Sequence, residues 1–211
     1  NPIDLSDEKS FLDYISNVDS ACYESDLKYF RWNTVLDFQG KDETLLHTIA
    51  DRKEHQPEAI SYYKDASKTE TTDSCSNFGS LQAINVVKRN QSGVILELEL
   101  EFQNGAVSVQ SEYNMRAILG CGITNINLLD GSSVEMSILP SAYISIQAKG
   151  DGTYAVLGGG YGHGIGMSQN GAQKLCGQGF DYKRILNYFY QDTELTELYQ
   201  PQNMTKEEGG A

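Results

Sequence analysis

Apolar and polar residues alternate most regularly in the middle of the chain. The run VILELELEF at 94–102 alternates at almost every position, and weaker alternation occupies 81–89 and 106–110. A period of two is typical of strands that turn one face to a core. Asn104-Gly105, between two of these runs, is a strong hairpin signal. The pattern predicts three consecutive antiparallel strands.

The three glutamates of the middle run, Glu97, Glu99 and Glu101, share one face of the predicted strand. Their regular spacing predicts a solvated outer face and not a pair of catalytic carboxylates. Helical spacing and capping residues predict helices at 42–54, 113–119, 169–176 and 182–189, with Ser111 at the start of the helix at 113–119. Residues 6–16, capped by Ser6, are expected to form a short helix or an ordered entry segment. Tyr182, Ile185, Leu186 and Phe189 form the expected buried face of the last helix. Further strands are expected at 29–38, 134–139, 143–149 and 153–157, and a long surface loop at 63–80.

These elements indicate an α+β fold with a mainly antiparallel sheet between residues 29 and 157. A barrel-like closure is one form that this sheet can take. The two helices of 168–190 are expected to pack across it. Residues 1–199 are expected to form one portion of a domain, and residues 200–211 a disordered tail with little to bury.

Charge narrows the range of partners. The formal net charge is -13, and the phosphates of a nucleic acid would be repelled by such a surface. Nucleic acid is therefore excluded as a partner, whereas uncharged glycans can be held by hydrogen bonds and by the 13 tyrosines. No run of eighteen apolar residues and no basic leader appears, so neither a membrane anchor nor a signal peptide is expected within this sequence.

The four cysteines are widely spaced, at Cys22, Cys75, Cys121 and Cys176, and no CxxC motif occurs. Free or partly buried thiols are the favoured interpretation, and a zinc site built from such dispersed residues is the alternative. No cluster has the spacing of metal ligands. The sequence therefore predicts no metal and no cofactor.

A glycine-rich stretch, GGGYGHGIGMSQNGA at 158–172, carries the most distinctive chemistry. Glycines permit positive φ and bring backbone amides close to a ligand or to a neighbouring element. Ser168 is expected to cap the following helix by accepting from the amide of Asn170 or Gly171. The stretch lacks the Gly-Lys-Ser/Thr ending of a Walker loop, the third glycine of a dinucleotide loop and the G-x-S-x-G spacing of a nucleophile elbow.

Four residues of this stretch are candidate substrate-binding residues: Tyr161, His163, Ser168 and Gln169. Glycines on both sides of His163 remove neighbouring side chains, and a capped helix presents free amides behind it, which suits sugar hydroxyl and amide groups. His163 is expected to be reachable by solvent in a concave site shared with Tyr161 or Gln169. The alternative is a buried ring whose two nitrogens are bonded by the backbone.

Three residues outside the stretch are further candidates. Arg31 and Trp32 form a binding-like pair, but Trp32 packed in the core beside a solvated Arg31 is an equally simple arrangement. Arg116 has the reach to hold a carboxylate of the protein or of a substrate, and a structural salt bridge is its alternative role.

The order Y-G-H-G-I-G-M-S-Q-x-G-A, followed by a short helix and F-D-Y-K-R-I-L-N-Y-F-Y, closely resembles the end of the SpoIID/LytB domain family. The aromatic-Arg-Trp segment at 30–32 and the Met-Arg and Leu-Gly pairs near Arg116 resemble the same family. One position departs, since the family usually has an aromatic residue where this chain has Asn170. The resemblance covers most of the sequence but only the later half of the family's domain.

The resemblance implies peptidoglycan remodelling, because full-length members are lytic transglycosylases. Their catalytic glutamate lies in a Gly-Glu segment that this sequence does not contain, so the chain alone is expected to hold no catalytic residue and to be inactive. A non-enzymatic wall-binding or amidase-enhancing module is the alternative. The implied partners are glycan strands, a cell-wall amidase or the missing N-terminal half of the domain. The implied location is extracytoplasmic, in a bacterial cell envelope.

Overall fold

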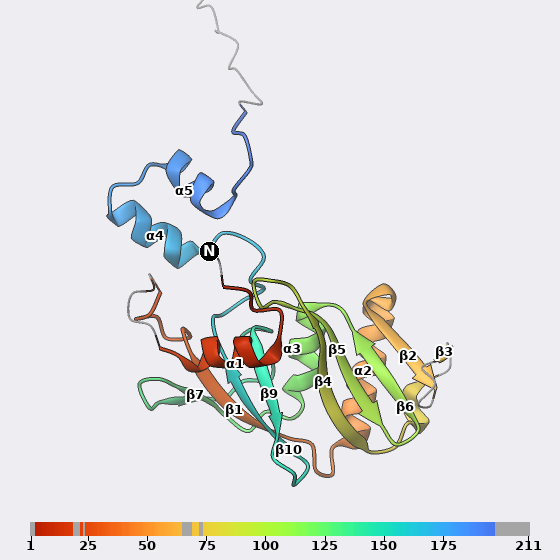
Figure 1. The fold of residues 1–211 in the computed structure, drawn as a ribbon. Coiled ribbons are helices and arrows are strands. Elements are labelled where there is room, and N and C mark those ends of the chain that lie inside the picture. The colour runs from red at the N-terminus through yellow and green to blue at the C-terminus, as the bar shows by residue number, and fades with distance from the viewer. Residues whose placement is uncertain (1–2, 19–21, 23, 65–68, 72–73, 197–211) are drawn as a thin grey trace, which may run out of the picture. The chain divides into compact units, whose positions relative to one another are not determined.

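The computed structural model describes residues 3–18, 22, 24–64, 69–71 and 74–196 (Figure 1). The chain divides into two compact units, Asn1–Ile165 and Gly166–Ala211, and each is described by itself. The α+β class and the antiparallel pairing of the strands are confirmed. The expected tail at 200–211 lies outside the described residues.

One five-stranded sheet of the first unit, here the loop-bearing sheet, has the order β8-β7-β1-β10-β9. Its strands are β1 (Trp32–Asp37), β7 (Ile126–Leu128), β8 (Ser133–Val134), β9 (Ile144–Ala148) and β10 (Thr153–Gly158). The central strands β1 and β10 lie side by side in antiparallel register from Trp32 opposite Gly158 to Asp37 opposite Thr153 (Figure 1). The sequence pattern did not indicate β7, and of the strand expected at 134–139 only Val134 lies in a strand, as the last residue of β8.

The second sheet, here the hairpin sheet, has the order β3-β2-β6-β5-β4. Its strands are β2 (Ile60–Lys64), β3 (Thr69–Thr71), β4 (Leu81–Arg89), β5 (Ile95–Phe102) and β6 (Gly105–Val109). The predicted strands at 81–89, 94–102 and 106–110 are confirmed, and Phe102 pairs with Gly105 across the predicted hairpin turn. The described strands thus form two open sheets, and none of the described pairings closes a barrel.

Three helices belong to the first unit: α1 (Glu8–Ser16), α2 (Asp42–His55) and α3 (Glu112–Gly120). Ser111 caps α3 as predicted, because its hydroxyl accepts from the amide of Asn114. The cap of α1 is not Ser6. The carboxylate of Asp7 accepts from the amides of Lys9 and Ser10, so the helix begins after Asp7.

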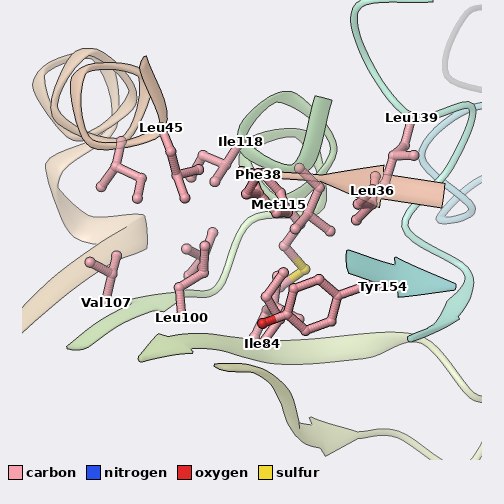
Figure 2. Packing of buried hydrophobic residues seen from close by; sticks show 14 of the residues in the cluster. Leu36, Phe38, Leu45, Ile84, Leu100, Val107, Met115, Ile118, Leu139 and Tyr154 are labelled. Atoms are coloured by element: carbon pink, nitrogen blue, oxygen red, sulfur yellow. The ribbon is translucent and has the colours of Figure 1, made fainter. Parts of the chain in front are cut away.

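One continuous core joins the two sheets with α2 and α3 (Figure 2), and the buried residues of α1 form a separate, smaller cluster. Leu45 of α2 and Met115 and Ile118 of α3 face Leu100 of the hairpin sheet, and Leu36 of β1 belongs to the same cluster. All five side chains are fully buried. Burial of this kind is the main favourable term in folding. The first unit is therefore stabilised as a whole and not sheet by sheet.

The expected solvated face of β5 is wrong at Glu99 and holds at Glu101, which is exposed. Glu99 has 4% of its surface exposed and lies in register between Asn85 of β4 and Ser108 of β6. The polar segment 63–80 is not one long surface loop. It contains the end of β2, the strand β3 and a short 3₁₀ helix, η2 (Cys75–Asn77), whose Cys75 is buried together with the adjacent Phe78.

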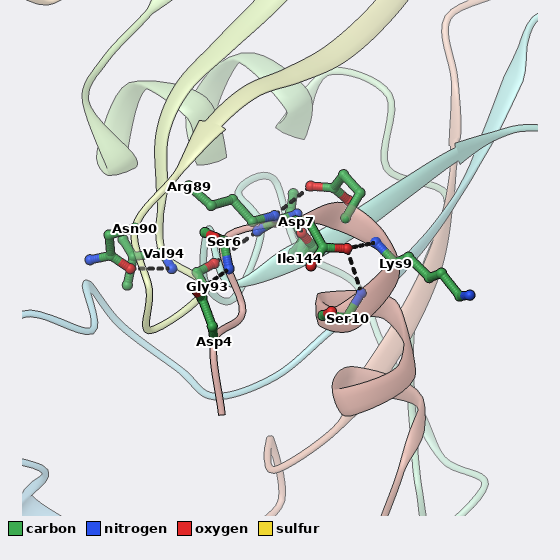
Figure 3. Close-up of polar contacts among 11 residues, drawn as sticks. Asp4, Ser6, Asp7, Lys9, Ser10, Arg89, Asn90, Gly93, Val94 and Ile144 are labelled. Atoms are coloured by element: carbon green, nitrogen blue, oxygen red, sulfur yellow. Dashed lines mark hydrogen bonds and ion pairs between the residues drawn. The ribbon is translucent and has the colours of Figure 1, made fainter. Parts of the chain in front are cut away.

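A buried arginine fastens α1 to the rest of the first unit (Figure 3). Arg89, the last residue of β4, donates from Nε to the carboxylate of Glu8, from Nη1 to the Gly93 carbonyl (2.8 Å) and from Nη2 to the Ile144 carbonyl (2.6 Å). Its guanidinium carbon lies 3.8 Å from the centre of the Phe11 ring. Arg89 therefore links the hairpin sheet, the loop-bearing sheet and α1, with a hydrogen bond from each of its three side-chain nitrogens.

The second unit is a helical hairpin of α4 (Gln169–Gly177) and α5 (Tyr182–Phe189). Ser168 caps α4 by accepting from the Gly171 amide at 3.0 Å, as predicted, and Asp181 caps α5. Leu175 and Ile185 are buried. The expected four-residue buried face of α5 is wrong at Tyr182, which is exposed, because a two-helix hairpin covers only a narrow stripe of each helix.

Candidate functional site

The glycine-rich loop begins where β10 ends against Trp32. Gly158 lies opposite Trp32 in the strand pairing, and a Cβ atom added to Gly158 would lie 2.2 Å from the indole ring. The indole N–H of Trp32 donates to the Gly160 carbonyl at 3.1 Å. Glycine is thus needed at position 158 for close approach of the ring, and Trp32 fixes the first turn of the loop.

Hydrogen bonds with distant segments hold the backbone of the next residues of the loop. These contacts are Gly160 N to Tyr29 O (2.8 Å), Gly162 N to Pro140 O (2.9 Å) and Ser141 Oγ to Gly159 O (2.7 Å). Gly160, Gly162 and Gly164 have φ values of 78°, 113° and 73°, which are strained for residues with a side chain. The glycines therefore allow the backbone turns of the loop, and the hydrogen bonds to Tyr29, Pro140 and Ser141 hold those turns in place.

His163 is exposed in this loop, and its ring is held by its own backbone. The amide of Ile165 donates to Nδ1 at 2.9 Å. Because Nδ1 accepts this bond, the neutral ring carries its proton on Nε2. Nε2–H is then a hydrogen-bond donor whose direction is set by the turn. The buried, backbone-bonded ring of the alternative interpretation does not match this arrangement.

An aromatic pair lies beside the histidine in sequence. The ring of Tyr161 is 64% exposed, and its centre lies 4.8 Å from that of Tyr29 with 37° between the planes. The backbone carbonyl of Tyr29 also accepts a hydrogen bond from the Gly160 amide, so Tyr29 positions both the backbone of the loop and the ring of Tyr161. An exposed aromatic face that is packed from behind can bind the apolar face of a sugar.

Ser168 and Gln169, the other two candidates of the stretch, belong to the second unit. The hydroxyl of Ser168 is used in the cap of α4, and Gln169 is the exposed first residue of that helix. The division between the units falls between Ile165 and Gly166. A site shared by His163 and Gln169 therefore stays a prediction.

Arg31 and Trp32 are both buried. Trp32, with 2% of its surface exposed, packs in the main core, which is the structural alternative considered from the sequence. Arg31 is 8% exposed, so the idea of a solvated Arg31 is wrong. Its Nη1 donates to the carbonyl of Phe30 at 2.9 Å. Trp32 positions the loop from inside the core.

Arg116 forms the structural salt bridge considered as its alternative role. Its Nη1 lies 3.3 Å from the carboxylate of Glu112 on the same helix, and its Nε donates to the Leu139 carbonyl at 2.8 Å. Leu139 precedes Pro140, whose carbonyl accepts from Gly162. Arg116 thus supports the glycine-rich loop indirectly, through the segment that the loop contacts.

Sequence reasoning missed three residues that frame the loop: Tyr29, Pro140 and Ser141. Tyr29 carried a weak signal, because it lies in the same aromatic segment as Arg31 and Trp32. Pro140 and Ser141 carried none, since their contacts are made through a carbonyl and a hydroxyl with residues about twenty positions away.

The described part of the chain contains no group of three or more His, Cys, Asp or Glu placed to hold a metal ion. The four cysteines are free thiols, and burial raises the pKa of Cys75. None of the described helices combines the length and the apolar character needed to cross a bilayer.

The fold and the loop define a class: an α+β protein of two antiparallel sheets whose glycine-rich, histidine-bearing loop leaves the end of a central strand. The chain belongs to the family described as a domain of unknown function, DUF8618, which matches residues 52–166, more than half of the chain. The matched region contains Arg116, Tyr161 and His163. Arg31 and Ser168 lie outside it.

Two curated relatives come from Bacillus subtilis (strain 168). The chain is 34% identical over 89 residues to a protein named amidase enhancer, covering 42% of this chain and 12% of the relative. It is 36% identical over 76 residues to stage II sporulation protein D, covering 36% of this chain and 22% of the relative. The chain thus spans less than a quarter of either relative, and its relationship to SpoIID/LytB-type proteins is confirmed. No solved structure matches the chain.

Proposed function

We propose that this chain is the glycan-contacting portion of a peptidoglycan-remodelling protein of the SpoIID/LytB type, located in a bacterial cell envelope. The observation that carries the proposal is the exposed His163, whose Nε2–H is oriented by the Ile165 amide next to the exposed ring of Tyr161. The names of the two relatives, an amidase enhancer and a stage II sporulation protein, support a role at the cell wall.

The chemistry of the loop suits an uncharged carbohydrate. Glycan strands offer hydroxyl and amide oxygens to a donor such as Nε2–H of His163, and apolar ring faces to an aromatic surface such as Tyr161. The net charge of -13 would repel a polyanion but does not oppose a glycan. In this proposal Arg116 and Trp32 shape the loop, and His163 and Tyr161 touch the sugar.

The proposed reaction of the whole protein is lytic cleavage of the glycan. A carboxylic acid protonates the glycosidic oxygen, and the muramyl 6-hydroxyl attacks the anomeric carbon to close an anhydro ring while the same carboxylate takes its proton. In this proposal the acid is a glutamate outside this chain. The chain by itself binds and does not cut.

Sedimentation with purified, insoluble peptidoglycan tests the binding role. His163→Ala should weaken binding about fivefold, the effect of losing one hydrogen bond of about 1 kcal/mol. His55→Ala is the matched control, because His55 is also exposed and its Nδ1 is also bonded to a backbone atom, the Asp51 carbonyl at 2.7 Å. Equal binding by the two folded variants would refute the role of His163.

A second candidate function is a non-enzymatic one, in which the chain enhances a cell-wall amidase. The name of the relative that is 34% identical favours it. The two candidates differ in products: enhancement raises the amidase rate when the chain is added, with no anhydromuropeptides. Release of anhydromuropeptides by this chain alone would contradict the placement of the catalytic acid outside it.

A further inference from the structure

The first unit contains two buried arginines, Arg31 and Arg89, that are stacked on aromatic rings next to α1. Arg89 lies over Phe11, and Arg31 lies with its guanidinium carbon 5.2 Å from the centre of the Tyr14 ring. Arg89 has a carboxylate partner in Glu8 and two carbonyl partners. Among the described residues, no carboxylate pairs with Arg31.

The hydrogen bonds of Arg31 leave one edge of its guanidinium free. Nη1 donates to the Phe30 carbonyl at 2.9 Å, and the ring of Phe30 lies 4.3 Å from the guanidinium carbon. Nε is buried without a partner, and it is the one such side-chain atom within the described part of the chain. The free edge is the side formed by Nε and Nη2.

This free edge is the one that matches a carboxylate. Two parallel N–H groups on one side of a guanidinium fit the two oxygens of a carboxylate in a bidentate pair. Arg89 shows part of this pairing, because its Nε donates to the Glu8 carboxylate, although its Nη2 bonds the Ile144 carbonyl. An arginine is always charged, and leaving such a charge buried and unpaired is costly.

We propose that the Nε–Nη2 edge of Arg31 binds the carboxylate of a small organic acid. Arg31 lies against the glycine-rich loop, since a Cβ atom added to Gly159 would lie 3.0 Å from Nη1. A carboxylate bound here therefore lies next to the candidate sugar site. On the proposed function, on which this step rests, the carboxylate is the lactyl group of a muramyl residue that carries no stem peptide, because an attached peptide converts this carboxylate into an amide.

The aromatic ring of Tyr14 lies beside the guanidinium of Arg31. This half-buried ring, on the surface helix α1, packs on the guanidinium. In this proposal a ligand reaches Nε after the Tyr14 side chain changes rotamer, which costs little compared with a charged bidentate pair.

The side-chain Nε–Hε signals of the two arginines, observed by ¹⁵N NMR on the unmodified chain, test the proposal. The chain is titrated with sodium acetate, N-acetylmuramic acid, N-acetylglucosamine and sodium chloride at equal ionic strength. The Arg31 signal should shift saturably with the two acids and stay in place with the neutral sugar and with chloride. The Arg89 signal is the internal control and should stay in place throughout, because its carboxylate site is filled.

The outcomes separate the site from the source of its ligand. An Arg31 signal that does not respond to acetate, or that responds equally to chloride, overturns the carboxylate site. A response to acetate without one to N-acetylmuramic acid overturns the muramyl assignment. Neither result changes the sedimentation of the His163 variants, so failure of the proposed function is seen separately. Arg31→Lys, which keeps the charge and loses Nε, should weaken carboxylate binding about tenfold.

Discussion

The two sheets of the first unit are built in different ways. In the hairpin sheet, β4, β5 and β6 follow one another along the chain and pair with their neighbours in sequence. In the loop-bearing sheet, the central pair joins Trp32 to Gly158. Strands β4, β5 and β6 of the hairpin sheet thus pair through local contacts, whereas the central pair of the loop-bearing sheet joins distant segments. The candidate site lies on the loop-bearing sheet, so its geometry depends on the whole unit being folded.

The largest effect on stability is expected when core volume is removed from the hairpin sheet. Leu100→Ala should lower the free energy of unfolding by about 3 kcal/mol, because Leu100 is fully buried in β5. Fluorescence of Trp32, the single tryptophan, reports on the loop-bearing sheet, and far-ultraviolet circular dichroism reports on both sheets. Since one core joins the sheets, both signals should shift together.

Leu96→Ala is the matched control on the same strand, because 39% of Leu96 is exposed. It should change stability by no more than about 0.5 kcal/mol. Separate unfolding transitions for the two signals in Leu100→Ala would show that the sheets are independent.

The next largest effect is expected where β10 meets Trp32. Gly158→Ala should destabilise the chain by about 2 kcal/mol, since the added Cβ would overlap the indole ring. The emission of Trp32 should change in the folded state, which a general loss of stability would not produce. Gly177→Ala is the control, because an added Cβ there meets nothing within 4 Å. An unchanged emission spectrum would argue against the contact.

A smaller effect is expected at alkaline pH. Burial raises the pKa of the Cys75 thiol, which lies in η2 between β3 and β4. Burial also raises the pKa of Tyr143, next to β9, to about 12. Groups whose pKa is raised by folding contribute stability that is present below their unfolded values and lost as pH rises. For the thiol that loss begins near its ordinary value of 9.0.

Urea unfolding of the wild type should therefore show a midpoint that falls between about pH 8 and about pH 10. Cys75→Ala should be less stable at the lower pH and should show a shallower fall. A fall of equal slope in both proteins would exclude the thiol as its cause.

The smallest effect is expected at acidic pH in α1, the helix that packs against β9 and β10. Hydrogen bonds from Ser10, through its side chain and then its amide, lower the pKa of Asp7 below 3.8. A lowered pKa contributes stability that is present above the unfolded value and lost as pH falls through the folded value. Asp7→Asn should therefore lose part of the acid dependence of the melting temperature below about pH 4. Asp13→Asn, at an exposed carboxylate within the same helix, should retain it.

The same contrast explains how much could be predicted. The hairpin strands and the caps at Ser111 and Ser168 depend on residues a few positions apart, and the sequence predicts them. β7 and the burial of Glu99 depend on which strands become neighbours, and three residues of β7 are too few for a periodic signal.

The candidate site follows the same division. The glycines and His163 stand out in the sequence, because their types and spacing are unusual. Their anchors, Tyr29, Pro140 and Ser141, act through main-chain groups or a hydroxyl that many residues could supply. The free edge of Arg31 depends on which carboxylates reach it, and no local pattern encodes that.

The pairing of Trp32 with Gly158 also sets a delay during synthesis on the ribosome. Translation proceeds at about 5–20 residues per second, so β1 leaves the exit tunnel on the order of ten seconds before β10 does. During that interval the backbone groups of β1 have no partner from β10 and can pair with another nascent chain. Slow translation would lengthen the time for which β1 lacks this partner. A chaperone that binds extended apolar segments would protect β1 from pairing with another chain during that time. Strands β4, β5 and β6 of the hairpin sheet wait for a much shorter time, because they follow one another along the chain.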